Sequence, residues 1–229
     1  MRIIALGDRD PRHLTHREID ATLALLSGQV DCGWVATDSA EARELQAVDA
    51  VWLLPGTPYR DDGAARAAIH HCLETGTPFL GTCGGFQYAC VELARARAGV
   101  CDATSAELNP GGSALVVAPL ACSLYGERRT VTPVAGTRLA AICGAEPFEG
   151  HHHCGYGLAD AYEVVLARAG VVISAHAPDA GVEGVELPDH PFFVATAFQP
   201  QVGSSQSGAV HPLITALLTA AAASLQPQA

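Results

Sequence analysis

The sequence predicts an α/β fold with a mostly parallel central sheet that is covered by helices on both faces. Short runs of β-branched and aromatic residues alternate along the chain with segments of helical periodicity. Glycine and proline end several of these runs, as Pro55 and Gly56 do after "AVDAVWLL". Hydrophobic residues make up 49% of the 229 residues and charged residues 16%, which is typical of a globular chain rather than a disordered one.

The first half of the chain alternates regularly between the two kinds of element. We expect strands at residues 1–7, 32–39, 47–56 and 77–83, and helices at residues 15–28, 39–46, 61–76 and 85–99. Thr15 and Glu18 have the spacing of a capping box, while Gly28 and Gly76 stand where two of the helices should end.

The pattern changes after Cys101. Short strands at 113–120 and 128–134, separated by glycine and proline, predict a β-rich excursion at the edge of the sheet. The segments expected to return to the main sheet are residues 161–170, 171–177, 182–188 and 191–200, and a closing helix follows at 211–225. Because no repeat or low-complexity linker interrupts the chain, we expect one domain over residues 1–229.

Charge and hydropathy exclude several classes of function. The net charge is −11 and no block of Lys or Arg occurs, which argues against non-specific binding to nucleic acid or to an anionic membrane. The N-terminus lacks the pattern of a signal peptide, and no apolar run reaches the roughly 18 residues of a membrane span. We therefore expect a cytoplasmic protein.

Cys83 stands at the most informative point of the chain, in the stretch "FLGTCGGFQYA". Gly81, Gly84 and Gly85 flank it where a buried strand should turn sharply into a helix. Such a turn would aim the backbone N–H groups of the helix at the thiol, lower its pKa and supply donors to an oxyanion. The alternative is a small buried side chain beside a flexible turn. The other cysteines are scattered without a CxxC pair, as expected of buried thiols in a reducing compartment.

The stretches "LPGT", "FLGTCGGFQYACVELAR", "GTRLAAICGAEPFEGHHH" and "GVELPDHPFFVATAFQPQ" together resemble the glutaminase half of CTP synthase, a class I glutamine amidotransferase domain. The chain is most similar to a free-standing group described as CTP synthase C-terminal region-related proteins, some of which contain selenocysteine. The resemblance implies a flavodoxin-like three-layer sandwich. It also implies a Cys-His-Glu triad that releases ammonia from glutamine.

Site residues follow from the resemblance by position. Cys83 would be the nucleophile, and the backbone N–H groups of Gly56 and Gly84 would form the oxyanion hole. Gln87 and Glu107 would contact the substrate. No metal or cofactor is implied.

Two departures from the family pattern fall within this site. Where the family has histidine and glutamate in "FHPE", this chain reads "FQPQ", so Gln199 and Gln201 occupy the positions of the base and of its orienting carboxylate. An amide cannot take a proton from a thiol. At the position of the arginine that would hold the α-carboxylate of glutamine, this chain has Cys154, with an uncertainty of one residue in the spacing.

The run "HHHC" leaves three interpretations open. His151 or His153 could replace the missing base, with Cys154 as a redox or acyl-transfer partner of Cys83. Histidine and cysteine could instead bind zinc, although no second pair with matching spacing occurs in the sequence. The histidines could also only pack or hydrogen-bond, as two of them echo the family's own "HRH".

These observations favour a cysteine-dependent hydrolase or transferase that acts on an amide or thioester of a small molecule other than free glutamine. One alternative is a non-catalytic binding or regulatory protein that retains the pocket. Another is a glutaminase that supplies ammonia to a separate synthetase. Without the synthetase half, the chain alone should not make CTP. A separate acceptor enzyme would be the natural partner, and the sequence leaves open whether the chain forms a homo-oligomer.

Overall fold

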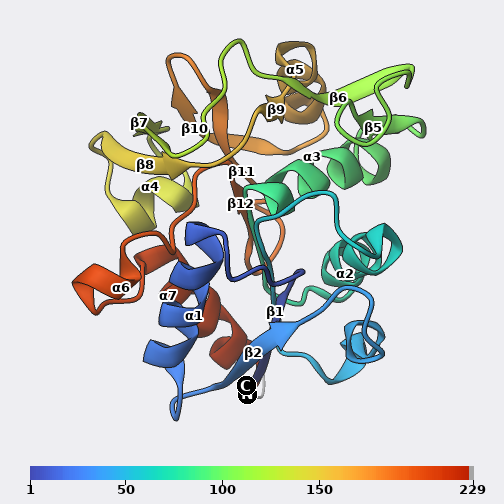
Figure 1. Ribbon diagram of the computed structural model, residues 1–229. Helices are drawn as coiled ribbons and strands as arrows, with labels where there is room; N and C mark the ends of the chain where they lie inside the picture. Colours follow the sequence, from blue (N-terminus) through green and yellow to red (C-terminus); the bar gives the residue numbers. More distant parts are fainter. Residues whose placement is uncertain (227–229) are drawn as a thin grey trace.

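The computed structural model describes residues 1–226, in which a central sheet lies between two layers of helices (Figure 1). The strands of this sheet follow the order β2-β1-β3-β4-β12-β11-β10-β7-β8. Their bounds are β1 Arg2–Leu6, β2 Asp31–Val35, β3 Ala50–Leu53, β4 Phe79–Thr82, β7 Glu127–Pro133, β8 Phe148–His152, β10 Val172–Ala177, β11 Gly181–Glu186 and β12 Phe193–Thr196. A smaller sheet consists of β5 Ala103–Ser105, β6 Ala114–Pro119 and β9 Tyr156–Leu158.

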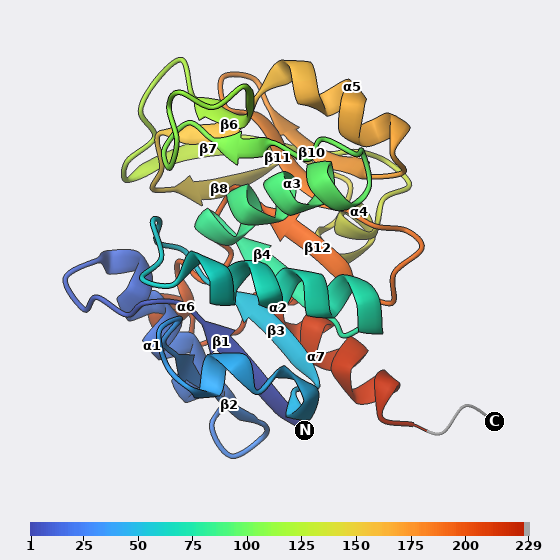
Figure 2. The same cartoon turned by 90° about the vertical axis from the view of Figure 1, so that its right-hand side faces the viewer.

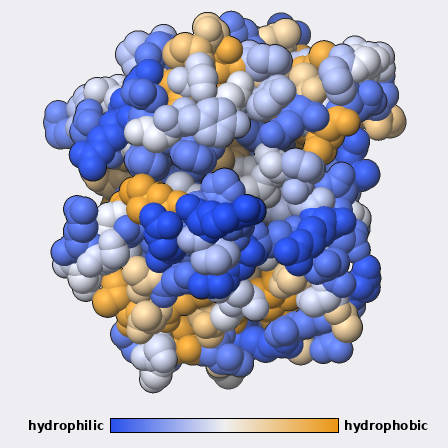
Figure 3. Space-filling view, in the orientation of Figure 1, coloured by the Kyte–Doolittle hydropathy of each residue, from blue (hydrophilic) through white to orange (hydrophobic). Residues whose placement is uncertain are grey.

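Helices cover both faces of the main sheet, as the alternating pattern predicted (Figures 1 and 2). One face carries α2 Asp62–Thr75, α3 Gly84–Ala96 and α5 Asp160–Arg168, and the other carries α1 Leu14–Leu26, α4 Arg138–Cys143 and α7 Pro212–Ser224. The short helix α6 Ser204–Ser207 lies beside α1. Hydrophilic residues dominate the face seen in Figure 3, and the apolar side chains on it form only small groups.

The main sheet is mixed rather than mostly parallel. Strands β2, β1, β3, β4 and β12 run parallel to their neighbours, whereas β11, β10, β7 and β8 add antiparallel pairs to the β12 side. The turn between β10 and β11 is short, which an antiparallel pair allows and a parallel pair does not. The parallel half therefore keeps the α/β arrangement, in which the carboxyl ends of the strands lie at one edge of the sheet. The antiparallel half extends the sheet beyond β12.

The parallel strands are buried on both sides because each face of the sheet is covered. All four residues of β3 are buried, and Trp52 is 1% exposed. Towards α1 and α7 the core contains Ile19, Trp52 and Leu213, and towards α2 and α3 it contains Ile69 and Phe86. This burial makes the sheet a rigid support for the loops at its carboxyl edge.

Several local predictions were wrong. Residues 160–168, expected to join the sheet, form helix α5, and residues 39–46 form only two short 3₁₀ turns. The N-cap residue of α1 is His13, and its side chain forms no capping hydrogen bond with the helix backbone. Glu18 instead accepts hydrogen bonds from the backbone N–H groups of Gly203 and Ser205, because α1 packs against α6. A tertiary contact has replaced the predicted capping box.

Among residues 1–226, no helix is both long enough and apolar enough to cross a bilayer.

Candidate active site

Cys83 lies at the abrupt turn from β4 into α3, as the flanking glycines predicted. Its φ angle is 52°, and no other non-glycine residue of the described part of the chain has a positive φ. The Cys83 N–H donates to the carbonyl of Thr196 at 2.8 Å, and its own carbonyl accepts from Gln87 N–H at 3.1 Å. Holding a cysteine in this conformation costs on the order of 1–3 kcal/mol, which folds usually retain at functional positions.

Two glycines make this turn sterically feasible. A Cβ atom on Gly85 would lie 2.2 Å from the carbonyl oxygen of Leu53, and one on Gly81 would lie 2.7 Å from the carbonyl oxygen of Gly85. The strand and the helix therefore approach so closely that no side chain fits between them. This approach places the N-terminus of α3 directly at the end of β4.

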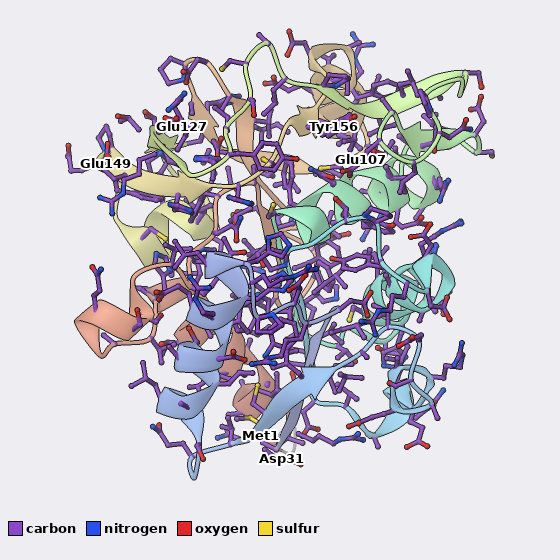
Figure 4. All side chains as sticks on the ribbon, viewed as in Figure 1. Met1, Asp31, Glu107, Glu127, Glu149 and Tyr156 are labelled. Carbon is purple, nitrogen blue, oxygen red and sulfur yellow. The ribbon has the colours of Figure 1, made fainter. Side chains whose placement is uncertain are left out.

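Cys83 opens into a cavity of about 300 Å³ at the carboxyl edge of the parallel strands. Figure 4 shows two of its residues, Glu107 and Tyr156, close to each other beside α3. The lining residues are Asp8, Asp10, His13, Thr15, His16, Pro55, Gly56, Thr57, Pro58, Cys83, Gln87, Glu107, Tyr125, His153, Cys154, Gly155, Tyr156 and Gln199. None of them is lysine or arginine, so the cavity of the described chain contains no permanent positive charge.

Cys154 lines the same cavity, and its thiol lies close enough to that of Cys83 for each to shift the pKa of the other. Both side chains are nearly buried, with 6% of Cys83 and 7% of Cys154 exposed, and both are free thiols. The hydrogen bond with Cys83 lowers the pKa of Cys154, whereas the interaction with Cys154, followed by burial, raises the pKa of Cys83. Cys154 therefore gives up the first proton, and the Cys83 thiol donates its hydrogen to the resulting thiolate.

Behind Cys154 lies a buried ion pair between His152 of β8 and Glu183 of β11. The two carboxylate oxygens of Glu183 lie 2.8 and 2.9 Å from His152 Nε2, and His152 Nδ1 lies 3.1 Å from the carbonyl oxygen of Gly150. Both ring nitrogens face acceptors, so the ring binds as an imidazolium. Burial alone would lower the pKa of His152, but the hydrogen bond and charge of Glu183 raise it. The positive charge of His152 in turn lowers the pKa of Cys154.

The two glutamines at the family's triad positions bind each other. Gln201 Nε2 donates to Gln199 Oε1 at 2.8 Å, and the side chains are 0% and 2% exposed. Gln199 lines the cavity, and its backbone N–H donates to the carbonyl of His151 at 2.8 Å. The side chains at these two positions thus remain in contact, but neither can exchange a proton at neutral pH.

The predicted oxyanion residues face each other across the loop after β3. Gly56 has a φ of 110°, and a Cβ atom on Gly84 would lie 3.3 Å from Gly56 N. The backbone N–H of Gly84 also donates to the Cys83 sulfur, which lowers its pKa. The start of α3 and the loop after β3 are therefore in close contact at these two glycines.

The predicted substrate-contact residues also line this cavity. Gln87 Nε2 donates to the carbonyl of Tyr156 at 3.1 Å, and Glu107 accepts a hydrogen bond from the hydroxyl of Thr57 at 2.6 Å. Gln87 Oε1 is buried and has no hydrogen-bond partner in residues 1–226. Gln87, which lines the cavity, thus holds an acceptor without a partner among the described residues.

The histidines that the sequence singled out are separated in the structure. His153 lines the cavity with Cys83, whereas His151 lines a neighbouring cavity of about 430 Å³ together with Glu18 and Arg128. Strand β8 ends at His152, so the alternation of its side chains does not carry His151 and His153 to one place. The structure thus provides no support for His151 as a partner of Cys83.

Two histidines of the cavity were not predicted. The ring of His13 lies 5.4 Å from that of His16 and 6.1 Å from that of His153, measured between centroids. Burial and the neighbouring histidine lower the pKa values of His16 and His153. Within residues 1–226, no group of three or more histidine, cysteine or acidic side chains is arranged to hold a metal ion.

Sequence reasoning also missed His152 and Glu183. The central histidine of "HHH" had no feature to separate it from its neighbours, although a glutamate in the apolar strand "VEGVEL" was a signal. A carboxylate at an inward position of a buried strand requires a partner.

The fold, with a cysteine at the turn from β4 into α3, is that of a class I glutamine amidotransferase, and comparison with known proteins agrees. The profile of that family, Glutamine amidotransferase class-I, matches residues 15–213. The chain therefore belongs to the class I glutamine amidotransferase family. The predicted α/β fold class of that family is confirmed.

Within the family, the chain is similar to CTP synthases. It is 35% identical over 211 residues to CTP synthase of Synechococcus sp. (strain WH7803), an alignment that covers 84% of this chain and 38% of that protein. It is 34% identical over 218 residues to CTP synthase of Methanopyrus kandleri, with coverage of 84% and 39%. The chain thus spans less than two fifths of the length of these relatives.

Solved structures show the same fold. The glutaminase domain of Trypanosoma brucei CTPS, solved with bound acivicin, has a TM-score of 0.83 and 23% identity over 97% of this chain and 94% of that one. A glutamine amidotransferase from Thermotoga maritima has a TM-score of 0.61 and 15% identity over 99% of this chain and 86% of that one.

Proposed function

We propose that the chain is a cysteine-dependent hydrolase or transferase that acts on an amide or thioester other than free glutamine. The observation that carries this proposal is that Cys154 lines the cavity beside Cys83 and interacts both with that thiol and with the charge of His152. In this arrangement Cys154 takes over the proton-transfer role that Gln199 cannot perform.

The proposed reaction begins when the Cys83 sulfur attacks the carbonyl carbon and passes its proton to the Cys154 thiolate. The N–H groups of Gly56 and Gly84 would stabilise the oxyanion that forms. Cys154 then returns the proton to the leaving amine or thiol, which leaves an acyl group on Cys83. Water or an acceptor molecule releases that group in the second half of the reaction.

The charges of the cavity support a substrate without a carboxylate at this position. Asp8, Asp10 and Glu107 line the cavity, and lysine and arginine are absent from its lining in the described chain. An α-carboxylate would therefore meet three carboxylates and no lysine or arginine to bind it, in keeping with the expected place of Cys154 at the position of the family's arginine. A neutral or amine-bearing substrate fits this environment better than glutamine does.

A separate acceptor enzyme and a cytoplasmic location belong to the same proposal. The named relatives are CTP synthases, of which this chain spans less than two fifths, and the proposed acceptor is a separate enzyme. All eight cysteines lie within residues 1–226 and are free thiols, which suits a reducing compartment.

The test is the formation of an acyl-enzyme from uncharged and amine-bearing p-nitrophenyl esters and thioesters, followed by intact-mass measurement and peptide mapping. We expect one acyl group on Cys83 and none in Cys83→Ser. Cys154→Ala should acylate more slowly, by about 10²–10⁴-fold, the usual contribution of a general acid–base group. A protein that binds these compounds without acylation would instead be a non-catalytic binding protein, and efficient glutamine hydrolysis would identify a glutaminase.

A further inference from the structure

Cys83 and Cys154, two free cysteines, line the same cavity, and the thiol of each shifts the pKa of the other. They come from distant parts of the sequence, the β4–α3 turn and the segment after β8, and both line the cavity. The four cysteines at Cys32, Cys72, Cys90 and Cys143 lie elsewhere, and burial raises the pKa of each. Two neighbouring thiols that line one cavity of about 300 Å³ can react together with a small molecule in that cavity.

We propose that Cys83 and Cys154 form a redox pair that undergoes thiol–disulfide exchange with a small, positively charged or neutral disulfide entering this cavity. The exchange reaction does not depend on the proposed acyl chemistry. Its consequence for the site does rest on that proposal: the dithiol form can be acylated, and the disulfide form cannot.

The exchange balances with the small disulfide as oxidant. One cysteine thiolate attacks a sulfur of the disulfide, and the first small thiolate leaves and takes up a proton. The second cysteine then loses its proton, attacks the protein sulfur of the mixed disulfide and displaces the second small thiolate. The protein loses two hydrogens and two electrons, and the disulfide becomes two thiols.

Surrounding groups favour this exchange. The Cys83 thiol, the charge of His152 and the backbone N–H of Tyr156 lower the pKa of Cys154, which favours its thiolate, the nucleophile of the exchange. The carboxylates of the cavity and the absence of lysine and arginine from its described lining select against an anionic disulfide. This selection distinguishes the pair from an exposed thiol, which would accept either kind of reagent.

The experiment compares cystamine, which is cationic, with dithiodipropionate, which is anionic and of similar size. The background protein carries Cys101→Ser and Cys122→Ser, because these two cysteines are exposed and would react on their own. Cys83→Ser and Cys154→Ser are then made in that background. After removal of reductant, intact mass and peptide mapping follow each protein over time, and a folded-state readout such as circular dichroism confirms that the variants are intact.

In the background protein we expect cystamine to produce a Cys83–Cys154 disulfide without lasting adducts, and dithiothreitol to reverse it. Each single variant should instead keep one cysteamine adduct on its remaining cysteine. Cystamine should exceed dithiodipropionate in rate by about tenfold or more, relative to the same ratio in urea-unfolded protein. Lasting adducts on both cysteines of the background protein, or equal relative rates for the two reagents, would overturn the proposal. Exchange without acylation by any ester would contradict only the proposed function.

Discussion

His152 donates a hydrogen bond from Nε2 to a carboxylate oxygen of Glu183 at 2.8 Å, and neither side chain is exposed. Removing two charges from water is expensive, so such a pair survives only where each partner is compensated. Here the Glu183 carboxylate accepts a hydrogen bond from His152 Nε2, and the carbonyl oxygen of Gly150 accepts one from His152 Nδ1. The pair also places a positive charge beside Cys154, where it stabilises a thiolate.

Glu183→Gln should strongly destabilise the fold, because it leaves a buried imidazolium without its counter-charge. The expected loss in the free energy of unfolding is about 3–5 kcal/mol, measured by urea denaturation. The pKa of His152 is raised above its ordinary value of 6.5, since the interactions with Glu183 outweigh burial. The pair's contribution to stability is therefore fully present below that value and is lost as pH rises through the raised pKa.

Glu186→Gln is the matched control, because Glu186 lies on the same strand and accepts only backbone N–H groups, those of Arg138 and Leu139. As pH rises above about 6.5, the wild-type protein and Glu186→Gln should both lose stability as His152 deprotonates. Glu183→Gln should lack that loss. The same pH dependence in all three proteins would show that His152 and Glu183 are not coupled.

Gly85→Ala tests the close contact between β3 and α3. Its Cβ atom would lie 2.2 Å from the carbonyl oxygen of Leu53, so strand and helix must separate. We expect a loss of about 1–3 kcal/mol or more in the free energy of unfolding, together with slower alkylation of Cys83. Gly33→Ala is the control, since a Cβ atom there meets nothing within 4 Å. If both variants unfold at the same urea concentration, the packing at Gly85 is looser than described.

The elbow could be predicted from sequence because its determinants are local. Gly81, Gly84 and Gly85 surround Cys83 within five residues, and an apolar strand precedes them. The resemblance to amidotransferases then supplied Gly56, Gln87 and Glu107, all of which line the same cavity or its rim. The exchange of His and Glu for Gln199 and Gln201 was also visible in the sequence.

The partner of Cys154 could not be predicted, because it depends on tertiary structure. His152 and Glu183 are 31 positions apart and lie on strands that are not neighbours in the sheet. The hydrophobic periodicity of a sequence carries no information about a contact between such distant strands. Segment 161–170 was wrongly predicted to join the sheet for a related reason. The stretch "AYEVVLARAG" is short and apolar enough to be a strand. In the structure it packs against α3 and β10 as helix α5.

Restoring the family's triad should not restore glutaminase activity. In Gln199→His/Gln201→Glu, the buried hydrogen bond between these positions can re-form as a histidine–carboxylate pair. The cavity still lacks a cation for the α-carboxylate, whose loss costs roughly 1.5–3 kcal/mol of binding. Glutamate release from glutamine should therefore stay low, and adding Cys154→Arg should raise it. Ordinary amidotransferase turnover by the double variant would show that no carboxylate clamp is required.

The most direct measurement of the Cys83–Cys154 pair is the pH dependence of Cys83 alkylation by iodoacetamide, read by peptide mapping in the Cys101→Ser/Cys122→Ser background. The interaction with Cys154 raises the pKa of Cys83 and lowers that of Cys154. Cys154→Ala should therefore move the midpoint of Cys83 alkylation to lower pH, while Cys83→Ala should move that of Cys154 to higher pH. Profiles that do not change in either variant would contradict a shared proton, and with it the role of Cys154 as the partner of the nucleophile.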